Sequence, residues 1–167
     1  VVIVECVVCV SCSTAICILI CLVFFFQAED GIRYLVRSRG LGDVYKRQAL
    51  SLLFVGRFAF NKGIDVLLRV ANELLASRSA VRFILAGDGP ERAQMERDGL
   101  PSNVILAGKV DDPQLERLYA DCHALVLPTR FEGMPTVVLE AMARARPVVV
   151  GDGGAGAEIV AGTNGWI

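Results

Sequence analysis

Two carboxylates stand eight residues apart between Pro128 and Pro147, in a pattern that suggests a binding or catalytic site. Glu132 lies on a loop after the apolar run 125–127, which is predicted to be a buried strand. Glu140 lies on the helix that this loop enters, and Pro135 is predicted to be its first residue, because a missing N–H costs nothing there. Carboxylates beside a helix N-terminus could act as a general acid and base, or they could hold a ligand.

Two cations lie in the segment Gly56–Gly63, between the first predicted strand and the helix that follows it. Arg57 and Lys62 would stand near the electropositive N-terminus of the helix that begins around residue 136. This combination favours an anion pocket of the kind that suits a diphosphate. The alternative is that both side chains are solvated on an exposed loop, and that each glutamate is likewise a surface residue.

Alternating strands and helices must position these side chains. Apolar, β-branched runs predict strands at 52–55, 81–86, 104–107, 124–127 and 148–150, and amphipathic patterns predict helices at 64–75, 93–100, 115–120 and 136–145. This order predicts an α/β fold, a doubly wound parallel sheet covered on both faces. The handedness of the crossovers then brings the carboxyl ends of all strands to one side, where such folds bind ligands, and leaves little besides turns on the other.

Several other motifs favour structural roles. Gly87-Asp88-Gly89 is typical of a turn, because it lacks the third glycine of a dinucleotide fingerprint and follows the second strand; no phosphate-binding P-loop motif is present. Asp111-Asp112 precedes Pro113 and a helix, so capping explains these carboxylates better than metal binding does. His123 falls at the amino end of its strand, away from the predicted site, which disfavours a catalytic triad. A dehydrogenase is disfavoured because Arg57 and Lys62, not glycines, follow the first strand.

Composition separates the first 48 residues from the rest. The 167-residue chain has a formal net charge of −1 and a high mean hydropathy of +0.52, and residues 6–26 contain no charged side chain. All cysteines except Cys122 lie in that segment. From residue 49 on, the near-neutral charge, the absence of a disulfide framework and the lack of a basic patch indicate a cytoplasmic protein that binds no nucleic acid.

The leader at 1–48 has two interpretations. The run 1–26 is long enough to cross a bilayer, with Arg33, Arg37 and Arg39 following it on the cytoplasmic side. However, the run 27–33 reverse-translates without conflict to the flow-cell end of a sequencing-library adaptor. The run 38–48 fits the transposon end of the same kind of library, and only Tyr34 misfits. We therefore interpret 27–48 as translated adaptor and 1–26 as foreign too, which leaves 49–167 as the domain.

Four sequence runs together resemble one known family. They are, in order, G-R-F-A-F-N-K-G-I-D-V-L-L, A-G-D-G-P-E, L-Y-A-D-C-H-A-L-V-L-P-T-R-F-E-G-M-P-T-V-V-L-E-A-M-A and A-E-I-V-A-G-T-N-G-W. Their order and spacing resemble the donor-binding C-terminal domain of retaining GT-B glycosyltransferases of the family 4 type (glycosyl transferases group 1). The resemblance covers about residues 51–167 and implies a Rossmann-like half of a GT-B architecture, truncated at both ends.

The resemblance also implies roles for individual residues. Arg57 and Lys62 would hold the diphosphate of a nucleotide-sugar, with Glu132 on the sugar hydroxyls. Glu140 would hold the ribose. The donor site would further include Gly56, Gly133, Met134 and Thr136, with backbone N–H groups around Gly133 and Met134 facing the diphosphate. The sugar would pass to an unknown acceptor, whether glycan, lipid or small molecule, with retention at the anomeric carbon.

The resemblance has further consequences and some departures. No metal or cofactor is expected, the acceptor-binding N-terminal domain is missing, and peripheral contact with the inner face of the membrane remains open. Met134-Pro135 stands where the family often has Phe-Gly, so one backbone donor is absent. Ala145 replaces the usual glycine before the next strand, and the run 152–158 is a looser version of D-x-G-G-x-x-E. The main alternative function is a non-catalytic, membrane-anchored module that binds a nucleotide or another ligand.

Overall fold

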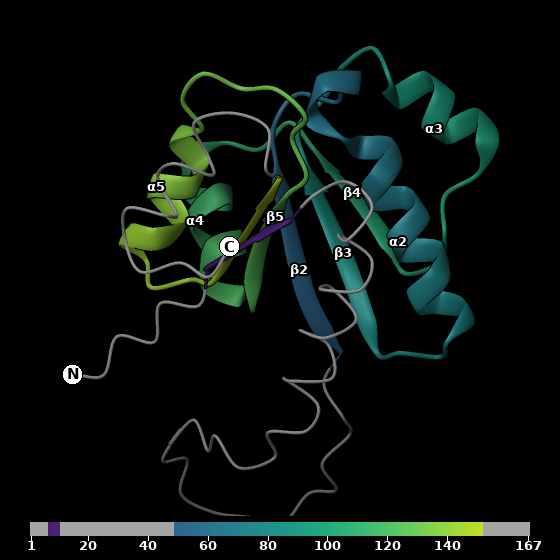
Figure 1. Ribbon diagram of the computed structural model, residues 1–167, viewed down its shortest axis with the longest axis horizontal. Coiled ribbons are helices and arrows are strands. Elements are labelled where there is room, and N and C mark those ends of the chain that lie inside the picture. Colours follow the sequence, from purple (N-terminus) through teal and green to yellow (C-terminus); the bar gives the residue numbers. More distant parts are fainter. Residues whose placement is uncertain (1–6, 11–48, 152–167) are drawn as a thin grey trace, which may run out of the picture.

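A parallel sheet forms the centre of the molecule in a computed structural model that describes residues 7–10 and 49–151 (Figure 1). Its strand order is β1-β6-β5-β2-β3-β4. The strands are β1 (Val7–Val10), β2 (Leu50–Val55), β3 (Val81–Ala86), β4 (Val104–Gly108), β5 (Ala124–Leu127) and β6 (Val148–Gly151). The prediction of a parallel α/β sheet is confirmed, with each predicted strand found within two residues of its predicted ends.

The chain order reverses direction across the sheet at β2. This strand pairs with β3 on one side, from Leu50 opposite Val81, and with β5 on the other, where Leu52 lies opposite Ala124. In open α/β sheets such a reversal leaves a crevice outside the carboxyl ends of the two diverging strands. The ligand-binding crevice is therefore expected between the loops that follow β2 and β5.

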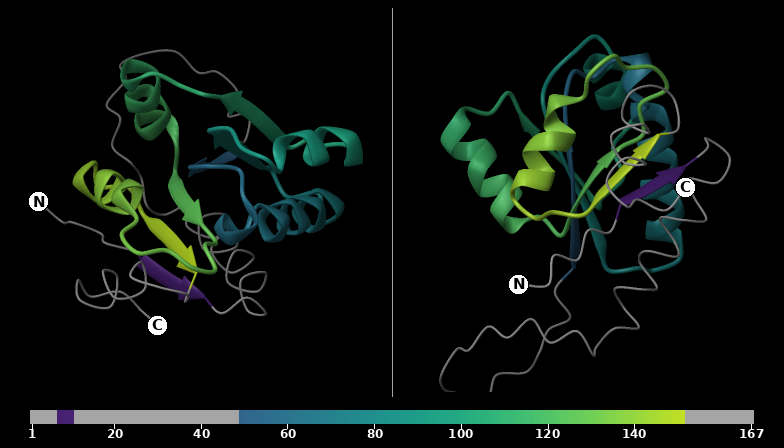
Figure 2. Two further views of the ribbon diagram at one scale, coloured as in Figure 1. Left: turned by 90° about the horizontal axis from the view of Figure 1, so that it is seen from above. Right: turned by 60° about the vertical axis from the view of Figure 1, so that its left-hand side comes forward.

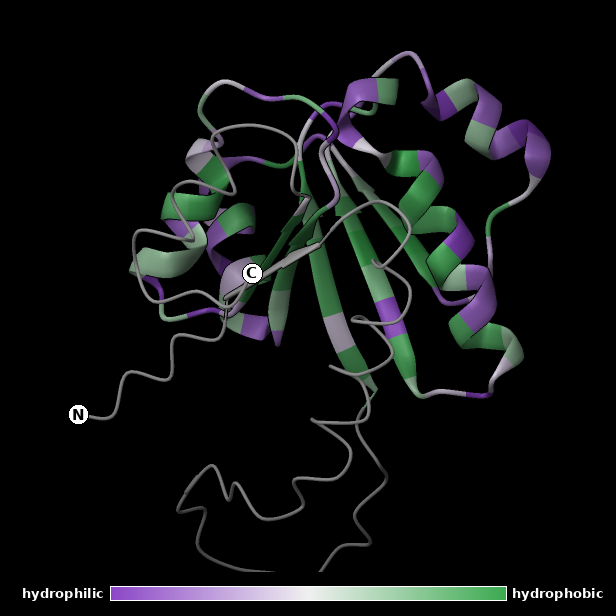
Figure 3. Ribbon diagram, viewed as in Figure 1, coloured by the Kyte–Doolittle hydropathy of each residue, from purple (hydrophilic) through white to green (hydrophobic). Residues whose placement is uncertain are grey.

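Helices cover both faces of the sheet, as predicted. They are α2 (Ile64–Ala76), α3 (Arg92–Asp98), α4 (Asp112–Asp121) and α5 (Thr136–Ala143), with a short 3-10 helix η1 (Phe60–Lys62) before α2. Figure 2 shows α2 and α3 on one side and α4 and α5 on the other. Hydrophobic residues follow the strands and the inner helix faces, whereas hydrophilic residues gather on the outer faces and in many of the loops (Figure 3).

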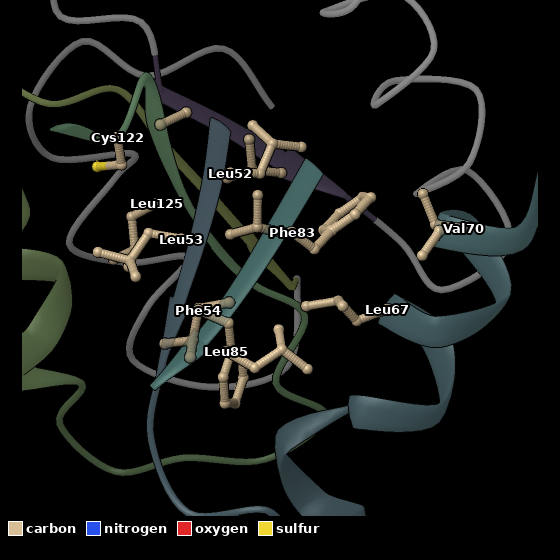
Figure 4. Packing of buried hydrophobic residues seen from close by; sticks show 14 of the residues in the cluster. Leu52, Leu53, Phe54, Leu67, Val70, Phe83, Leu85, Cys122 and Leu125 are labelled. Atoms are coloured by element: carbon tan, nitrogen blue, oxygen red, sulfur yellow. The ribbon is translucent and has the colours of Figure 1, made fainter. Parts of the chain in front are cut away.

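The core lies in two layers, one on each face of the sheet. Leu67 and Val70 of α2 point toward Phe83, whereas Leu53 and Leu125 lie on the opposite side of the strands (Figure 4). All five side chains are 2% exposed or less. Burying a side chain of this size contributes about 1.5–3 kcal/mol each, so these layers hold the carboxyl ends of the strands in fixed positions.

The last helix starts at residue 136 as its amphipathic pattern predicted, but its predicted end and the assignment of Pro135 as its first residue were wrong. Helix α5 begins at Thr136 and not at Pro135, because Pro135 has φ −80° and ψ 87° and serves as the cap residue. It ends at Ala143, two residues short of the prediction, and Ala145 then turns the chain with φ +52°. This is a left-handed backbone conformation that glycine adopts most easily, which gives a physical reason for the glycine expected there.

The amino end of the sheet carries more than the turns that were predicted. Arg82 donates from Nε to Ser51 Oγ at 2.6 Å, and the backbone N–H of Ser51 donates to Nδ1 of His123 at 3.0 Å. Arg146 donates to the carbonyl oxygens of Ala120 and Cys122 at 2.8 and 3.1 Å. These side chains form hydrogen bonds with the backbone or with Ser51. The prediction of a structural role for His123 is therefore supported by its contacts.

The two ends of the chain are described only in part. Strand β1 pairs in parallel with β6, with Val7 opposite Val148, while the rest of the leader lies outside the described residues. The looser motif at 152–158 also lies outside them. Within the described part of the chain, no helix has the length and apolar character needed to cross a membrane.

Candidate functional site

Lys62 and Glu132 meet where the ligand-binding crevice is expected, between the loops that follow β2 and β5, although 70 residues separate them in the sequence. Lys62 ends η1 and Glu132 lies on the β5–α5 loop, and Nζ donates to Oε1 in a salt bridge. Both side chains are largely buried, at 17% and 18% exposed. Thr129, which is 5% exposed, donates from Oγ1 to the other carboxylate oxygen at 3.3 Å. The carboxylate is therefore held from both sides.

Close backbone packing brings the two loops together. Gly63 adopts φ +69°, and a Cβ atom there would stand only 1.9 Å from the carbonyl oxygen of Pro128. The backbone N–H of Arg130 donates to the carbonyl of Asn61 at 2.9 Å. Only glycine permits both this backbone conformation and this approach, so the sequence N-K-G positions Lys62 against the loop that carries Glu132.

Arg130 fastens the same two loops through its side chain. Its guanidinium donates to both carboxylate oxygens of Asp65 at 2.8 and 2.6 Å and to the carbonyl of Phe60 at 2.7 Å. It also lies 4.2 Å from the centroid of the Phe60 ring. The bond from Arg130 lowers the pKa of Asp65 below its usual value. Paired bonds of this kind fix geometry as well as charge.

Arg57 lies at a neighbouring hollow over the carboxyl ends of β2, β3 and β4. The hollow has a volume of about 490 Å³ and is lined by Arg57, Asp88, Gly89 and Lys109. In the described part of the chain, neither Arg57 nor Lys109 forms a salt bridge, so two cations border this space without a partner. Arg57 and Lys62 thus flank the carboxyl end of β2 but have different neighbours.

The Gly87-Asp88-Gly89 turn supports the position of Arg57, in agreement with its predicted structural role. A Cβ atom on Gly89 would stand 2.3 Å from the carbonyl oxygen of Phe58. The backbone N–H of Phe58 donates to the carbonyl of Asp88 at 3.0 Å, and that of Gly56 donates to Ala86 at 3.0 Å. The glycines therefore allow the loops after β2 and β3 to lie in direct contact.

Backbone donors stand free just before α5. Of the residues described at 49–151, none accepts a hydrogen bond from the N–H of Gly133 or Met134. The N–H of Thr136, in contrast, donates to the carbonyl of Met134 at 3.1 Å. Unpaired N–H groups at a helix N-terminus carry partial positive charge and can bind an anion. Gly133 and Met134 thus meet this requirement, while the Thr136 N–H closes a turn.

Among the described residues, no hydrogen bond or salt bridge links Glu140 to Lys62 or to Glu132. It lies one turn into α5, is partly buried, and accepts a hydrogen bond from the hydroxyl of Tyr119 at 3.1 Å. The two glutamates therefore occupy different settings, since one pairs with a cation and the other with a buried phenol. This separation disfavours a general acid–base pair and favours two subsites for one extended ligand.

Exposed apolar side chains surround the crevice. Phe60, Phe131 and Met134 are 65%, 78% and 64% exposed, although residues of this kind are usually buried. They belong to η1 and to the β5–α5 loop, the two segments that carry Lys62 and Glu132. Sequence reasoning placed Met134 in the donor site but missed Phe60 and Phe131, and it also missed Thr129 and Arg130, whose only signal was their place directly after a buried strand.

The predicted capping role of Asp111 is confirmed. Asp111 caps α4, because its carboxylate accepts from the N–H of Gln114 at 2.9 Å while the Gln114 side chain accepts from the N–H of Asp111. Burial raises the pKa of the Cys122 thiol to about 11, which keeps the thiol protonated. Within the ranges described, no group of three or more potential ligands could hold a metal ion.

Fold and site together define a Rossmann-like domain in which cations, a carboxylate and backbone N–H groups gather at the reversal of its parallel sheet. The sequence model of the family described as glycosyl transferases group 1 matches residues 49–167. The chain therefore belongs to the glycosyl transferases group 1 family.

Related proteins agree with this assignment. The chain is 35% identical over 128 residues to the uncharacterized glycosyltransferase MJ1607 of Methanocaldococcus jannaschii, covering 74% of the chain and 32% of that protein. It is 34% identical over 105 residues to the alpha-D-kanosaminyltransferase of Streptomyces kanamyceticus, covering 60% of the chain and 27% of that protein. The chain thus spans about a third or less of the length of these relatives.

Solved structures show the same fold. The crystal structure of TarM superposes with a TM-score of 0.59 at 30% identity, over 71% of this chain and 25% of that one. The pneumococcal O-GlcNAc transferase GtfA in complex with UDP and GlcNAc superposes with a TM-score of 0.55 at 22% identity, over 66% of this chain and 22% of that one. At that identity, the second likeness supports the fold alone. Both agree with the predicted half of a GT-B architecture.

Proposed function

We propose that the full-length protein transfers a hexose-type sugar from a nucleotide-sugar donor to an acceptor, with retention of the anomeric configuration. The observation that carries this proposal is the meeting of Lys62 and Glu132 at the sheet reversal, beside N–H groups and an Arg57 side chain that have no partner among the described residues. A cation, a carboxylate and backbone donors match the diphosphate and the sugar hydroxyls of such a donor. The family match supports the same reaction class.

Each polar group then has one role. Lys62 and Arg57 bind the diphosphate, and the N–H groups of Gly133 and Met134 add hydrogen bonds to it. Glu132 accepts hydrogen bonds from the sugar hydroxyls. Its carboxylate is oriented for this by Thr129 and Lys62, so it needs no rearrangement when the sugar arrives. Gly56 and Thr136 border the same site, and Glu140 binds the ribose.

Transition-state charge explains why the cations are catalytic. Breaking the bond between sugar and phosphate builds negative charge on the departing nucleoside diphosphate. Lys62, Arg57 and the N-terminus of α5 are positioned before the reaction starts, so they stabilise that charge without reorganisation. The acceptor hydroxyl attacks from the face that the diphosphate leaves and passes its proton to the departing diphosphate oxygen, so the new bond keeps the original configuration. In this proposal the chain's own cations supply the positive charge, and no metal is involved.

The remaining part of the protein would bind the acceptor. Because the chain spans about a third or less of the length of its relatives, we propose that an N-terminal domain completes the cleft. The piece 49–167 alone would then bind nucleotide weakly and show no turnover. Detectable glycosyl transfer by that piece would contradict this proposal. A cytoplasmic location, with peripheral contact at the inner face of the membrane, would suit an acceptor that is a lipid or a membrane-linked glycan.

In this proposal the leader at 1–48 remains non-native, with the run 27–48 as translated adaptor and the run 1–26 as foreign sequence. Pairing of Val7–Val10 with β6 does not decide its origin, because a strand at the side of a sheet binds backbone groups and not particular side chains. Independent DNA libraries decide it directly. Reads that stop near codon 49 support the adaptor, whereas reads that continue from codon 26 through codon 49 support a native anchor and the alternative of a membrane-anchored binding module.

Product analysis tests the proposed reaction. The full-length protein is incubated with a panel of nucleotide-sugars and candidate acceptors, and the anomeric configuration of each product is read by proton NMR. We expect transfer from at least one donor, with the donor's configuration retained. An inverted product would exclude the retaining mechanism, and a complete lack of transfer across the panel would contradict glycosyl transfer. Nucleotide-sugar titrations in the same experiment identify the base and the sugar.

A further inference from the structure

Tyr119 connects α4 to the second glutamate of the site. Its side chain is 0% exposed, yet its hydroxyl lies 3.1 Å from Oε2 of Glu140 and 3.4 Å from the carbonyl oxygen of Val137. A buried hydroxyl is expected to have an acceptor, and both available acceptors belong to α5. The phenol therefore fixes the direction of a carboxylate that has greater exposure than the phenol itself.

Among the described residues, Tyr119 alone holds the carboxylate of Glu140 through a side-chain hydrogen bond. Arg144 lies 4.9 Å from the centroid of the Tyr119 ring, but it donates to the backbone carbonyl of Glu140 at 2.6 Å and pairs with Glu116. In the described part of the chain, Tyr119 is the one side chain that donates to the Glu140 carboxylate, and Oε1 accepts no hydrogen bond there. One oxygen is thus held while the other stays available.

The protonation state of Tyr119 suits this arrangement. Burial, and secondly the negative charge of Glu140, raise the pKa of the Tyr119 hydroxyl above its usual value. The hydroxyl therefore keeps its proton at neutral pH and always acts as the donor toward Glu140. A phenylalanine would fill nearly the same space, so replacing Tyr119 by phenylalanine removes the hydrogen bond that its proton shares between Glu140 and Val137 while the packing is kept.

We propose that Tyr119 is a positioning residue for nucleotide recognition: its hydroxyl holds Glu140 so that the carboxylate accepts the vicinal hydroxyls of the donor's ribose. This inference rests on the proposed function of Glu140. A carboxylate offers about four acceptor positions, of which Tyr119 takes one. Because the direction of the remaining ones is set before binding, the ribose hydroxyls meet acceptors that need not be ordered first. Tyr119 itself does not touch the nucleotide.

Binding selectivity for ribose is the readout. The full-length protein is titrated with UDP, GDP and ADP and with the 2′,3′-dideoxy form of each, and the ratio of the two dissociation constants is measured. For the nucleotide that binds, we expect the wild type to prefer the ribose form by about 10-fold or more, as for one or two hydrogen bonds to a charged group. Tyr119→Phe should remove most of this preference and leave the affinity for the dideoxy form unchanged.

Two further variants separate positioning from packing. Glu140→Gln should lose the preference, and Tyr119→Phe should add little in that background, because both act through one carboxylate. Glu116→Gln is the matched control, since it weakens the Arg144 link between α4 and α5 and leaves the Tyr119 hydroxyl in place. It should keep the ribose preference. If Tyr119 had a purely structural role, Tyr119→Phe would instead lower the melting temperature and weaken the binding of the ribose and dideoxy forms equally.

The outcomes are distinguishable. If no ribonucleoside diphosphate binds, the proposed function fails and this inference fails with it. If the wild type binds without a ribose preference, or Glu140→Gln keeps it, the role of Glu140 is wrong and so is that of Tyr119. If Glu140→Gln loses the preference but Tyr119→Phe keeps it, only this inference is overturned. Should Tyr119→Phe not fold, a crystal structure of the wild-type nucleotide complex decides. The inference requires the Tyr119 hydroxyl on the same carboxylate that accepts the ribose.

Discussion

At the carboxyl end of the sheet Arg57 and Lys109 border a hollow without an ion-pair partner in the described chain, whereas Arg82 and Arg146 at the amino end donate into the fold. The same side chain type thus has two uses. At the amino end each of these arginines bonds Ser51 or a backbone carbonyl, so its charge contributes to structure. At the carboxyl end the charges of Arg57 and Lys109 have no ion-pair partner among the described residues. Hydrogen bonds to the fold therefore distinguish the arginines of the amino end from Arg57 and Lys109, whereas Lys62 at the carboxyl end is paired with Glu132.

The largest expected effect concerns Lys62. Lys62→Ala in the full-length protein should lower turnover by about 10²–10³-fold, because one preorganised donor to the leaving diphosphate is lost. Steady-state kinetics with the identified donor measure this. Arg69→Ala, which removes an exposed cation from α2, is the control and should leave turnover unchanged. Unchanged turnover in Lys62→Ala would contradict the claim that cations at the carboxyl end of the sheet serve catalysis.

Arg130 sharpens the comparison, because it is a cation at the carboxyl end that is used structurally. Arg130→Ala should lower the free energy of unfolding by about 1 kcal/mol, a modest value since the Asp65 side chain is 47% exposed and solvent screens the pair. Urea unfolding measures this. Since Arg130 lowers the pKa of Asp65, the wild type should also lose this stability as pH falls below about 3.8, and the variant should not. Equal acid sensitivity in both proteins would contradict the role given to Arg130.

Ala145 allows a test of the structural role of the amino end of the sheet that involves no charged side chain. Its φ of +52° is unfavourable for alanine, so Ala145→Gly should raise the free energy of unfolding by about 0.5–1 kcal/mol. Arg78 provides a matched site, because it has φ +56° in the turn between α2 and β3, and Arg78→Gly should act in the same direction. Neither change should alter nucleotide binding. Destabilisation by both substitutions would show that these turns need the side chain.

The smallest expected effect is the pH dependence of folding stability that His123 causes, and its direction follows from the shift in the His123 pKa. Burial lowers the pKa of its imidazole, and the charges of Arg146 and Arg82 lower it further. Above pH of about 6.5 the imidazole is neutral in both the folded and the unfolded state. Below that pH the unfolded chain takes up the proton more readily, so folding stability falls. His123→Gln, in a chain with a single histidine, should remove this loss between pH 7.5 and pH 5.5. A loss of the same size in the variant would exclude His123 as its cause.

The sequence predicted the sheet well because its strands are continuous apolar runs between glycines and prolines. Buried strands of this kind have few alternative structures, so β3 and β5 were found at their predicted bounds. The end of α5 was not predicted, because alanine gives no signal for the left-handed conformation that Ala145 adopts. Helix propensity alone continued the helix through it.

The site was predictable in its residues but not in its partners. Lys62 and Glu132 were identified from spacing and resemblance, while their salt bridge depends on two loops that meet only in the folded chain. The same holds for Arg130 with Asp65 and for Tyr119 with Glu140, whose members lie 65 and 21 residues apart. Periodicity reports which face of an element is buried. It does not report which polar atoms face each other across two elements.

A crystal structure of the full-length protein with a bound nucleoside diphosphate tests the central claim most directly. The account predicts the diphosphate at the crevice between β2 and β5, in contact with Lys62 Nζ and the N–H groups of Gly133 and Met134. Arg57 should approach it from the hollow, and Glu132 should remain free to bind a sugar. A diphosphate bound away from Lys62, or held at the amino end of the sheet, would contradict the account.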